Sequence, residues 1–358
     1  MQKLTILWST WSIGTQTIDI VRQFPTELEV YALAVNGNNI DLFVDQIKEF
    51  FPKKVVIFNK EKKSDLEQRL AWIDVQILTW MEGLIAISED DNVDIIVNSV
   101  VWNIWVEPTR SALSKWKIVA LANKETIVVA WQEMKALEKK YGGEIRPIDS
   151  EHSAIWQCLR AWKREEVKKI WLTCSGGPFK DATLRPKEKL ETVTKEQALK
   201  HPTWTMGAKI TIDSSTLANK WLEVIEAVYL FGLRPDQVEV VIHPQSIVHS
   251  AVEFNDGSII AELGATDMRR AISYAIFGEQ RHENNLKNLS LFDLNLTFSK
   301  PDRERFPCLA LAEKAVRTSQ KACEVFSNVN EEAVALFLKG EIGFYDIPRL
   351  ISEKLENL

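Results

Sequence analysis

The stretch that decides the fold is Leu4-Thr5-Ile6-Leu7, followed by Trp8-Ser9-Thr10-Trp11-Ser12-Ile13-Gly14. The first part predicts a buried strand, and the loop after it leads directly into a helical segment. A strand, a short loop and a helix in this order open a dinucleotide-binding fold, in which the helix N-terminus faces a pyrophosphate. The motif normally contains several glycines, but only Gly14 is glycine here. The position of the loop between a strand and a helix supports a dinucleotide-binding fold, whereas its residue types alone are weak evidence for one.

The same alternation continues through the first 150 residues. A helical segment, Ile40–Phe50, ends before Pro52, as the restriction on residues preceding proline predicts. Continuous apolar strands separated by helices favour a Rossmann-type α/β fold with a doubly wound parallel sheet. The expected strands are Leu4–Leu7, Glu29–Ala34, Lys54–Ile57, Val75–Leu78, Asp94–Val97, Ile118–Leu121 and Glu144–Arg146.

The texture of the chain changes after Pro147. Polar clusters then alternate with strands such as Glu239–Ile242 and Ser258–Leu263, which predicts an α+β domain whose loops carry function. Helical patterns, including Asn330–Leu338, follow Cys308. We therefore expect a nucleotide-binding domain at 1–148, a catalytic domain at 149–279, a linker at 280–300 and a helical domain at 301–358.

Bulk properties exclude several classes of protein. A net charge of −6 gives no support to nucleic-acid binding, and no apolar run reaches the roughly 20 residues of a membrane span. A strand starting at Leu4 leaves no room for a signal peptide, so we expect a cytoplasmic protein. The four cysteines show no zinc-like spacing and are expected to be buried free thiols.

Two polar features could bind a metal ion. Asp149 and Glu151 are two residues apart, and their oxygen ligands suit Mg²⁺ or Mn²⁺, although an ordinary acidic loop would look the same. The helix expected over Leu217–Phe231 is apolar nearly all round, and its polar members fall on one side. That side is either a solvated stripe or the wall of an active site; it consists of Asn219, Lys220, Glu223 and Glu226.

Two loops could bind a substrate. Ser175-Gly176-Gly177 offers a hydroxyl and flexible backbone N–H groups, which fit either a phosphate site or a simple turn. His201-Pro202-Thr203-Trp204 fits either core packing or a closing lid. His243 is expected to be structural.

Longer strings of residues, taken together and in order, resemble the 1-deoxy-D-xylulose 5-phosphate reductoisomerase family over nearly the whole chain. The resemblance implies NADPH-dependent conversion of that sugar phosphate to 2-C-methyl-D-erythritol 4-phosphate in non-mevalonate isoprenoid synthesis, by a homodimer. The matching strings are Leu121–Glu125, Asp149–Ile155, Ser175–Phe179, His201–Gly207, Ile212–Ser214 and Asn219–Glu223.

The resemblance also implies residue roles. The metal, Mg²⁺ or Mn²⁺ with Co²⁺ as an alternative, is bound by Asp149, Glu151 and Glu223, which with Lys124 are the catalytic residues. Lys124 and Ser150 contact the substrate backbone, and Trp204 lies in a lid. The substrate phosphate is held by Ser175, His201, Ser214, Asn219 and Lys220. NADPH is bound by Thr10, Trp11, Ser12, Ile13, Gly37, Asn38, Asn39, Asn123, Glu125 and Gly207.

The chain departs from the family pattern in three ways. Asn38 stands where many relatives carry a basic residue near the ribose 2′-phosphate, and the family continues for several helical turns beyond Leu358, so we expect an incomplete helical domain. The third departure is tryptophan in place of glycine at Trp8, Trp11, Trp80, Trp102, Trp105, Trp116, Trp131 and Trp221.

An indole at position 11 would occupy the pyrophosphate space and could not adopt positive φ without strain. Either the chain is a non-catalytic homologue, or UGA codons that the source organism reads as glycine were translated as tryptophan. A different Rossmann dehydrogenase, acting on an aldehyde or semialdehyde without a metal, is the remaining alternative.

Overall fold

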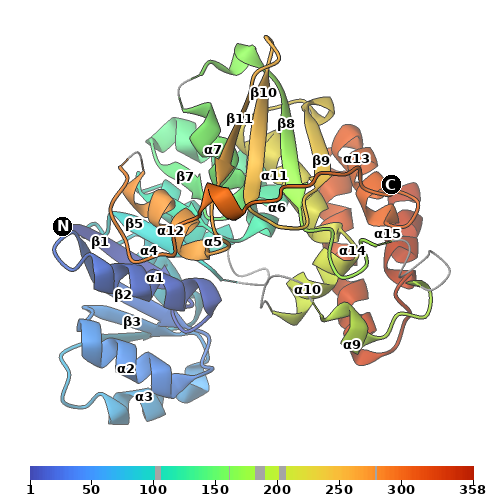
Figure 1. The fold of residues 1–358 in the computed structure, drawn as a ribbon. Helices are drawn as coiled ribbons and strands as arrows, with labels where there is room; N and C mark the ends of the chain where they lie inside the picture. The colour runs from blue at the N-terminus through green and yellow to red at the C-terminus, as the bar shows by residue number, and fades with distance from the viewer. Residues whose placement is uncertain (101–105, 161, 182–189, 201–206, 279) are drawn as a thin grey trace. The chain divides into compact units, whose positions relative to one another are not determined.

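The computed structural model describes residues 1–100, 106–160, 162–181, 190–200, 207–278 and 280–358. By packing, these residues form two compact units (Figure 1). The first unit comprises Met1–Thr126, Ala130–Ser153 and Asp267–Leu286, and the second comprises Ile127–Val129, Ala154–Thr266 and Lys287–Leu358. None of the helices in these ranges has the length and apolar character needed to cross a membrane.

The first unit is built on a seven-stranded, fully parallel sheet with the strand order β4-β3-β2-β1-β5-β6-β7. The central strand β1 is buried on both faces, since Leu4, Thr5 and Ile6 have no exposed surface. This double burial explains the continuous apolar runs in the sequence. The strands are β1 (Gln2–Leu7), β2 (Leu28–Val35), β3 (Lys54–Ile57), β4 (Gln76–Thr79), β5 (Ile95–Asn98), β6 (Ile118–Leu121) and β7 (Glu144–Pro147).

All seven strands expected from the sequence are present, which confirms the Rossmann-type fold. Strands β2 to β4 lie on one side of β1 and strands β5 to β7 on the other, so the strand order reverses at β1. Ligands of such folds bind beside the carboxyl ends of the strands at this reversal point. The helices whose residues belong mainly to the first unit are α1 (Ser12–Gln23), α2 (Ile40–Phe50), α3 (Lys63–Arg69), α4 (Trp80–Ser88), α5 (Val106–Leu113), α6 (Lys124–Tyr141) and α12 (Met268–Phe277), with η1 (Lys60–Lys62).

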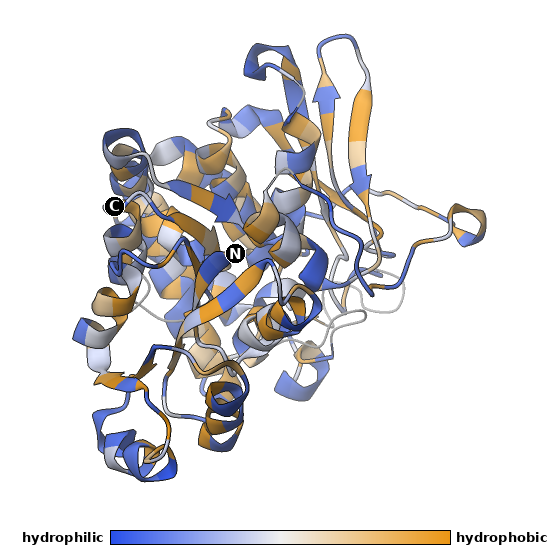
Figure 2. Ribbon diagram, turned by 90° about the vertical axis from the view of Figure 1, so that its left-hand side faces the viewer, coloured by the Kyte–Doolittle hydropathy of each residue, from blue (hydrophilic) through white to orange (hydrophobic). Residues whose placement is uncertain are grey.

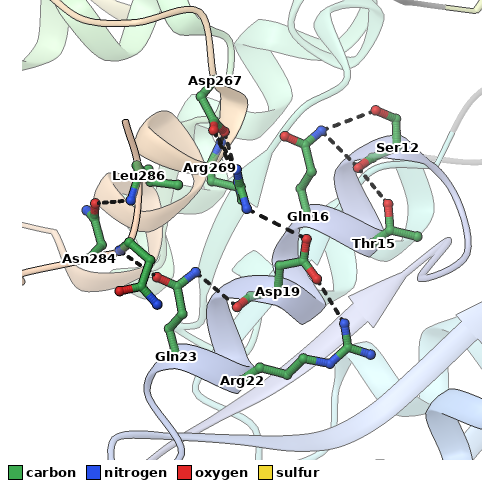
Figure 3. A network of polar contacts seen from close by, with 11 residues as sticks. Ser12, Thr15, Gln16, Asp19, Arg22, Gln23, Asp267, Arg269, Asn284 and Leu286 are labelled. Carbon is green, nitrogen blue, oxygen red and sulfur yellow. Dashed lines mark hydrogen bonds and ion pairs between the residues drawn. The ribbon is translucent and has the colours of Figure 1, made fainter. Parts of the chain in front are cut away.

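Helix α12 returns to the first unit from late in the sequence and packs against α1. Figure 3 shows the polar network at this contact, in which Arg269 lies between Asp267 and Asp19. Burial acts to raise the pKa of Asp267, but the hydrogen bonds from Arg269 outweigh it and the pKa lies below its usual value. The domain limits at 148, 279 and 300 stay a prediction, whereas packing places Asp267–Leu286 with the first unit.

The second unit contains a four-stranded mixed sheet with the order β11-β10-β8-β9. Strand β8 pairs parallel to β9 and antiparallel to β10, which in turn pairs antiparallel to β11. The expected strands near 239 and 258 are therefore confirmed. The strands are β8 (Val167–Cys174), β9 (Val238–Ile242), β10 (Val248–Phe254) and β11 (Ile259–Leu263).

One hydrophobic core joins this sheet to the C-terminal helices. Trp221 and Leu222 of α11 share it with Leu309, Phe326 and Ile347 of the last three helices, so the helical segment is part of the second unit. In Figure 2 single helices contain both hydrophobic and hydrophilic residues, as expected for elements with one buried side. The helices are α7 (Ser150–Leu159), which begins in the first unit, α9 (Lys195–Ala198), α10 (Ala208–Ser215), α11 (Ala218–Leu230), α13 (Pro307–Thr318), α14 (Gln320–Lys339) and α15 (Asp346–Glu356), with η2 (Arg164–Glu166), η3 (Pro235–Gln237) and η4 (Leu291–Asp293).

The cysteines are free and buried, as the sequence predicted. Burial raises the pKa of Cys158 and Cys308 to about 12, and that of Cys323 to about 11. The thiolate is the reactive form, so a thiol with a pKa near 12 is about one part in 10,000 reactive at pH 8.

We therefore expect these three thiols to resist iodoacetamide in the native protein at pH 8 and to be alkylated after unfolding in urea. Peptide mass spectrometry of the two samples measures this difference. Rapid stoichiometric labelling of any of the three in the folded protein would contradict their placement in the core.

Candidate active site

Lys124 and Asp149 meet at the carboxyl edge of the first sheet. Strands β6 and β7 pair in parallel with Leu121 opposite Pro147, so the loops that follow both strands start side by side. The Asn123 side chain accepts a hydrogen bond from the Thr126 backbone N–H at 2.9 Å and thereby caps α6, whose first residue is Lys124. The Lys124 Nζ atom lies 2.5 Å from Asp149 Oδ2, and both side chains are about nine-tenths buried.

The other carboxylate oxygen of Asp149 is held by its own helix start. Asp149 Oδ1 accepts the backbone N–H of Glu151 at 3.2 Å and lies 2.9 Å from His152 Nδ1. The Ser150 hydroxyl donates to Glu151 Oε2 at 2.7 Å. The two carboxylates predicted as metal ligands are therefore oriented by neighbouring donors. No role was predicted for His152, and the available signal was its position three residues after Asp149.

In the second unit, helix α11 carries the predicted polar side as a linked group. The Asn219 amide donates to Glu223 Oε1 at 2.6 Å, and the Lys220 ammonium contacts Glu223 Oε2. Lys220 and Glu223 are 4% and 1% exposed, so this is a buried ion pair and the solvated-stripe alternative is wrong for them. A buried carboxylate needs such partners, because an unpaired buried charge is strongly destabilising.

The Ser175-Gly176-Gly177 turn follows β8 and touches the end of α10. Both glycines have positive φ, 81° and 65°, and the Gly177 N–H donates to Ser175 Oγ at 3.2 Å. A Cβ atom on Gly177 would lie 2.7 Å from the Ser214 carbonyl oxygen. Only glycine permits this approach, which brings the loop carrying Ser175 against the residue Ser214. This arrangement fits the predicted phosphate site.

His243 is structural, as expected. Its Nε2 atom accepts the backbone N–H groups of Ile247 and Val248, each at 3.1 Å, and its Nδ1 atom lies 3.0 Å from the Thr297 carbonyl oxygen. With Nε2 an acceptor, Nδ1 is the donor to Thr297 and both ring nitrogens are committed to the fold.

The loop after β1 contains the residues predicted to hold the dinucleotide. A Cβ atom on Gly14 would lie 2.3 Å from the Trp8 carbonyl oxygen, so glycine is required where α1 crosses the end of β1. The Ser9 hydroxyl donates to Gln46 Oε1 at 2.7 Å, which ties the loop to α2. The Thr10 hydroxyl is buried and has no partner among the described residues. An unpaired buried hydroxyl at this edge fits a phosphate ligand.

The strain expected at Trp11 is not found. Trp11 precedes α1 with φ −95° and ψ 173°, which is ordinary extended backbone. The positive φ of this loop occurs at Trp8, with φ 61°. The expectation about Trp11 backbone strain was wrong because the turn places its left-handed residue directly after the strand.

The predicted site residues divide between the two units. The first unit contains Thr10, Trp11, Ser12, Ile13, Gly37, Asn38, Asn39, Asn123, Lys124, Glu125, Asp149, Ser150 and Glu151. The second contains Ser175, Gly207, Ser214, Asn219, Lys220 and Glu223. His201 and Trp204 lie outside the described residues, as do Trp102 and Trp105.

Comparison with known proteins agrees with this geometry. The model of 1-deoxy-D-xylulose 5-phosphate reductoisomerase matches residues 4–131, and two models of C-terminal domains of the same enzyme match residues 145–231 and 263–358. The reductoisomerase of Lachnoclostridium phytofermentans is 46% identical over 360 residues, covering 100% of this chain and 92% of its own. The chain belongs to the 1-deoxy-D-xylulose 5-phosphate reductoisomerase family.

Solved structures support the same assignment. A reductoisomerase in complex with NADPH, fosmidomycin and magnesium has a TM-score of 0.94 and 39% identity, over 100% of this chain and 90% of that one. The Zymomonas mobilis enzyme in complex with NADPH has a TM-score of 0.92 and 36% identity, over 100% and 92% of the two chains.

The close approach at Gly14 generates a prediction about stability. Gly14→Ala should lower the free energy of unfolding by about 1–3 kcal/mol, because the added methyl group overlaps backbone atoms that cannot move aside. Urea unfolding followed by circular dichroism measures the change.

Gly142→Ala is the control, since Gly142 ends α6 with φ 80° but a Cβ there meets nothing within 4 Å. It should show only the smaller cost of positive φ for alanine. An equal or larger loss in the control would mean that the Gly14 contact is not tight.

Proposed function

We propose that this protein catalyses the NADPH-dependent isomerisation and reduction of 1-deoxy-D-xylulose 5-phosphate to 2-C-methyl-D-erythritol 4-phosphate. The observation that carries the proposal is family membership over the full chain, at 46% identity to curated reductoisomerases. The oriented carboxylates would supply ligands for a divalent metal. The carboxyl edge of the parallel sheet is where folds of this type bind a dinucleotide. The alternative, another Rossmann dehydrogenase acting on an aldehyde or semialdehyde, would need no metal.

We propose that Asp149, Glu151 and Glu223 bind the divalent metal, Mg²⁺ or Mn²⁺ with Co²⁺ as an alternative. Carboxylate oxygens are the donors these hard cations prefer. Asp149 and Glu151 are held by hydrogen bonds at the start of α7, and Glu223 is held by Asn219 and Lys220 on α11. When bound, the metal supplies Lewis-acid polarisation of the substrate's hydroxyketone, and NADPH supplies the hydride.

We propose that the remaining residues bind and orient the substrate. Lys124 and Ser150 would contact its carbon backbone, and Lys124 already carries a positive charge against Asp149. The phosphate would be held by Ser175, Ser214, Asn219 and Lys220, with His201. Trp204 would close over the substrate and exclude water, which strengthens every charge interaction beneath it.

We propose that NADPH lies along the carboxyl edge of the first sheet. The buried Thr10 hydroxyl would bind a phosphate oxygen, and the N-terminus of α1 would face the pyrophosphate. Asn39, with φ 54°, and Gly37, with φ 121°, shape the loop after β2 where the adenosine ribose would lie. The remaining proposed contacts come from Trp11, Ser12, Ile13, Asn38, Asn123, Glu125 and Gly207. We also propose a homodimer, on family resemblance, and a cytoplasmic location.

Glu223→Gln tests the metal site. In a Trp8→Gly, Trp11→Gly background, which clears the cofactor loop, this change removes one ligand charge but keeps the shape. We expect at least a 100-fold loss of metal-dependent turnover, with NADPH affinity changed less than twofold. NADPH oxidation followed by absorbance, and NADPH titration by fluorescence, give the two quantities.

Glu239→Gln is the matched control, because Glu239 is a partly exposed carboxylate on β9 paired with Lys169. It should leave turnover unchanged. Equal loss of NADPH affinity and turnover in Glu223→Gln would contradict a role in metal binding.

Removal of the metal gives an independent test of the enzyme class. Exhaustive treatment with a chelator should abolish turnover, and added Mg²⁺ or Mn²⁺ should restore it. NADPH oxidation that persists at full rate without metal would favour a metal-independent dehydrogenase instead.

A further inference from the structure

The backbone at three tryptophans has a conformation that suits glycine. Trp8, Trp80 and Trp116 have φ of 61°, 60° and 52°. In the described part of the chain, seven non-glycine residues have positive φ, and three of them are tryptophan, a residue type that makes up 13 of 358 positions. Bulky L-residues rarely adopt this region because the Cβ atom crowds the backbone.

Trp116 shows the requirement most clearly. After α5, the Trp116 N–H donates to the Leu113 carbonyl and the Lys117 N–H donates to the Ala112 carbonyl, each at 3.2 Å. This pair of bonds is the Schellman motif, whose left-handed residue is usually glycine. Trp116 occupies that position, and its side chain is 69% exposed, so packing does not compensate for the strain.

The same chain uses glycine in the same motif elsewhere. After α14, the Gly340 N–H donates to Phe337 and the Glu341 N–H donates to Leu336, at 2.9 and 3.0 Å, and Gly340 has φ 79°. The two helix ends have the same hydrogen bonds and differ in the residue type at the left-handed position.

Trp8 has a second unfavourable feature besides its positive φ, which concerns its indole N–H. Its side chain is 1% exposed, and its indole Nε1 atom has no hydrogen-bond partner among the described residues. Leaving a buried donor unpaired costs free energy. Trp8 also follows β1 directly, at the point where the fold needs its backbone to approach a pyrophosphate.

Trp221 is anomalous for a different reason. It is fully buried in α11, its Nε1 atom also has no partner among the described residues, and its ring centroid lies 3.7 Å from that of Phe326. Aromatic pairs normally keep their centroids about 4.5–7 Å apart. The site is overfilled, and a much smaller side chain would relieve it.

Composition points in the same direction. The chain has 14 glycines and 13 tryptophans, together 27 of 358 residues. That total is about 7.5%, close to the usual glycine content of about 7%, whereas glycine alone falls well below it.

We propose that the protein made in its source cell carries glycine at the positions of Trp8, Trp80, Trp116 and Trp221, because UGA codons there are translated as glycine. A single codon read in two ways explains why one residue type replaces another at sites with unrelated surroundings. Independent mutations in a decaying gene would scatter over many residue types. Glycine is expected at these positions whatever reaction the protein catalyses.

The codons of the gene and the peptides of the native protein together test whether these positions carry glycine. We expect UGA at the codons for positions 8, 80, 116 and 221, and glycine in peptides of the protein isolated from source cells, identified by tandem mass spectrometry. Trp171 is the control, since its indole N–H donates to Glu253 at 2.9 Å from strand β8 and its environment fits tryptophan. Its codon should be UGG. UGG at the four proposed positions, or tryptophan in the native peptides, would overturn the inference.

A recombinant comparison tests the conformational basis separately. The starting protein is the recombinant chain with all 13 tryptophans. In that chain, Trp116→Gly should raise the midpoint temperature of thermal unfolding by about 2–4 °C, because it relieves backbone strain in a unit of this size. Trp171→Gly should lower it, since it removes a paired indole from a strand. A lower midpoint in Trp116→Gly would contradict the assignment of that position to glycine.

Discussion

The parallel alignment of seven strands is the constraint on which this structure depends. Parallel strands end at the same edge of the sheet, so every loop that follows a strand in the first unit starts along one line. The glycine-dependent loop after β1, the turn after β2, Lys124 after β6 and Asp149 after β7 therefore lie along the same edge of the sheet, although they come from distant parts of the sequence. Within that line, short-range bonds such as Lys124–Asp149 fix individual atoms.

The elements predicted with correct limits are those whose sequence signals are local. The buried strands β3 and β6 and the helix α2 have the same limits as expected, because apolar runs and a following proline are local properties. Strands β8 and β10 were not singled out. β8 carries charged residues such as Lys168 and Lys169, whose partners Glu253 and Glu239 lie on neighbouring strands and cannot be known before the sheet is formed.

The candidate site shows the same division. Asp149 and Glu151 could be recognised as a close pair of carboxylates, and Glu223 as one of the polar residues on one side of an otherwise apolar helix. The role of His152 was not predicted, since its contact with Asp149 depends on where α7 begins. The error at Trp11 had a similar origin: residue type says which conformations are costly, but hydrogen bonding around the turn decides which residue must adopt them. Here that residue is Trp8.

The return of α12 to the first sheet has a consequence for synthesis of the chain. Ile272, Ala275 and Ile276 complete the core that includes Ile18 of α1 and Ile148 after β7. The first unit therefore cannot bury its full core until the segment ending at Leu286 has left the ribosome, by which time much of the second unit has already emerged. The two units are interleaved in the order of translation, so residues Ala154–Thr266 of the second unit leave the ribosome before the first unit has all of its core residues.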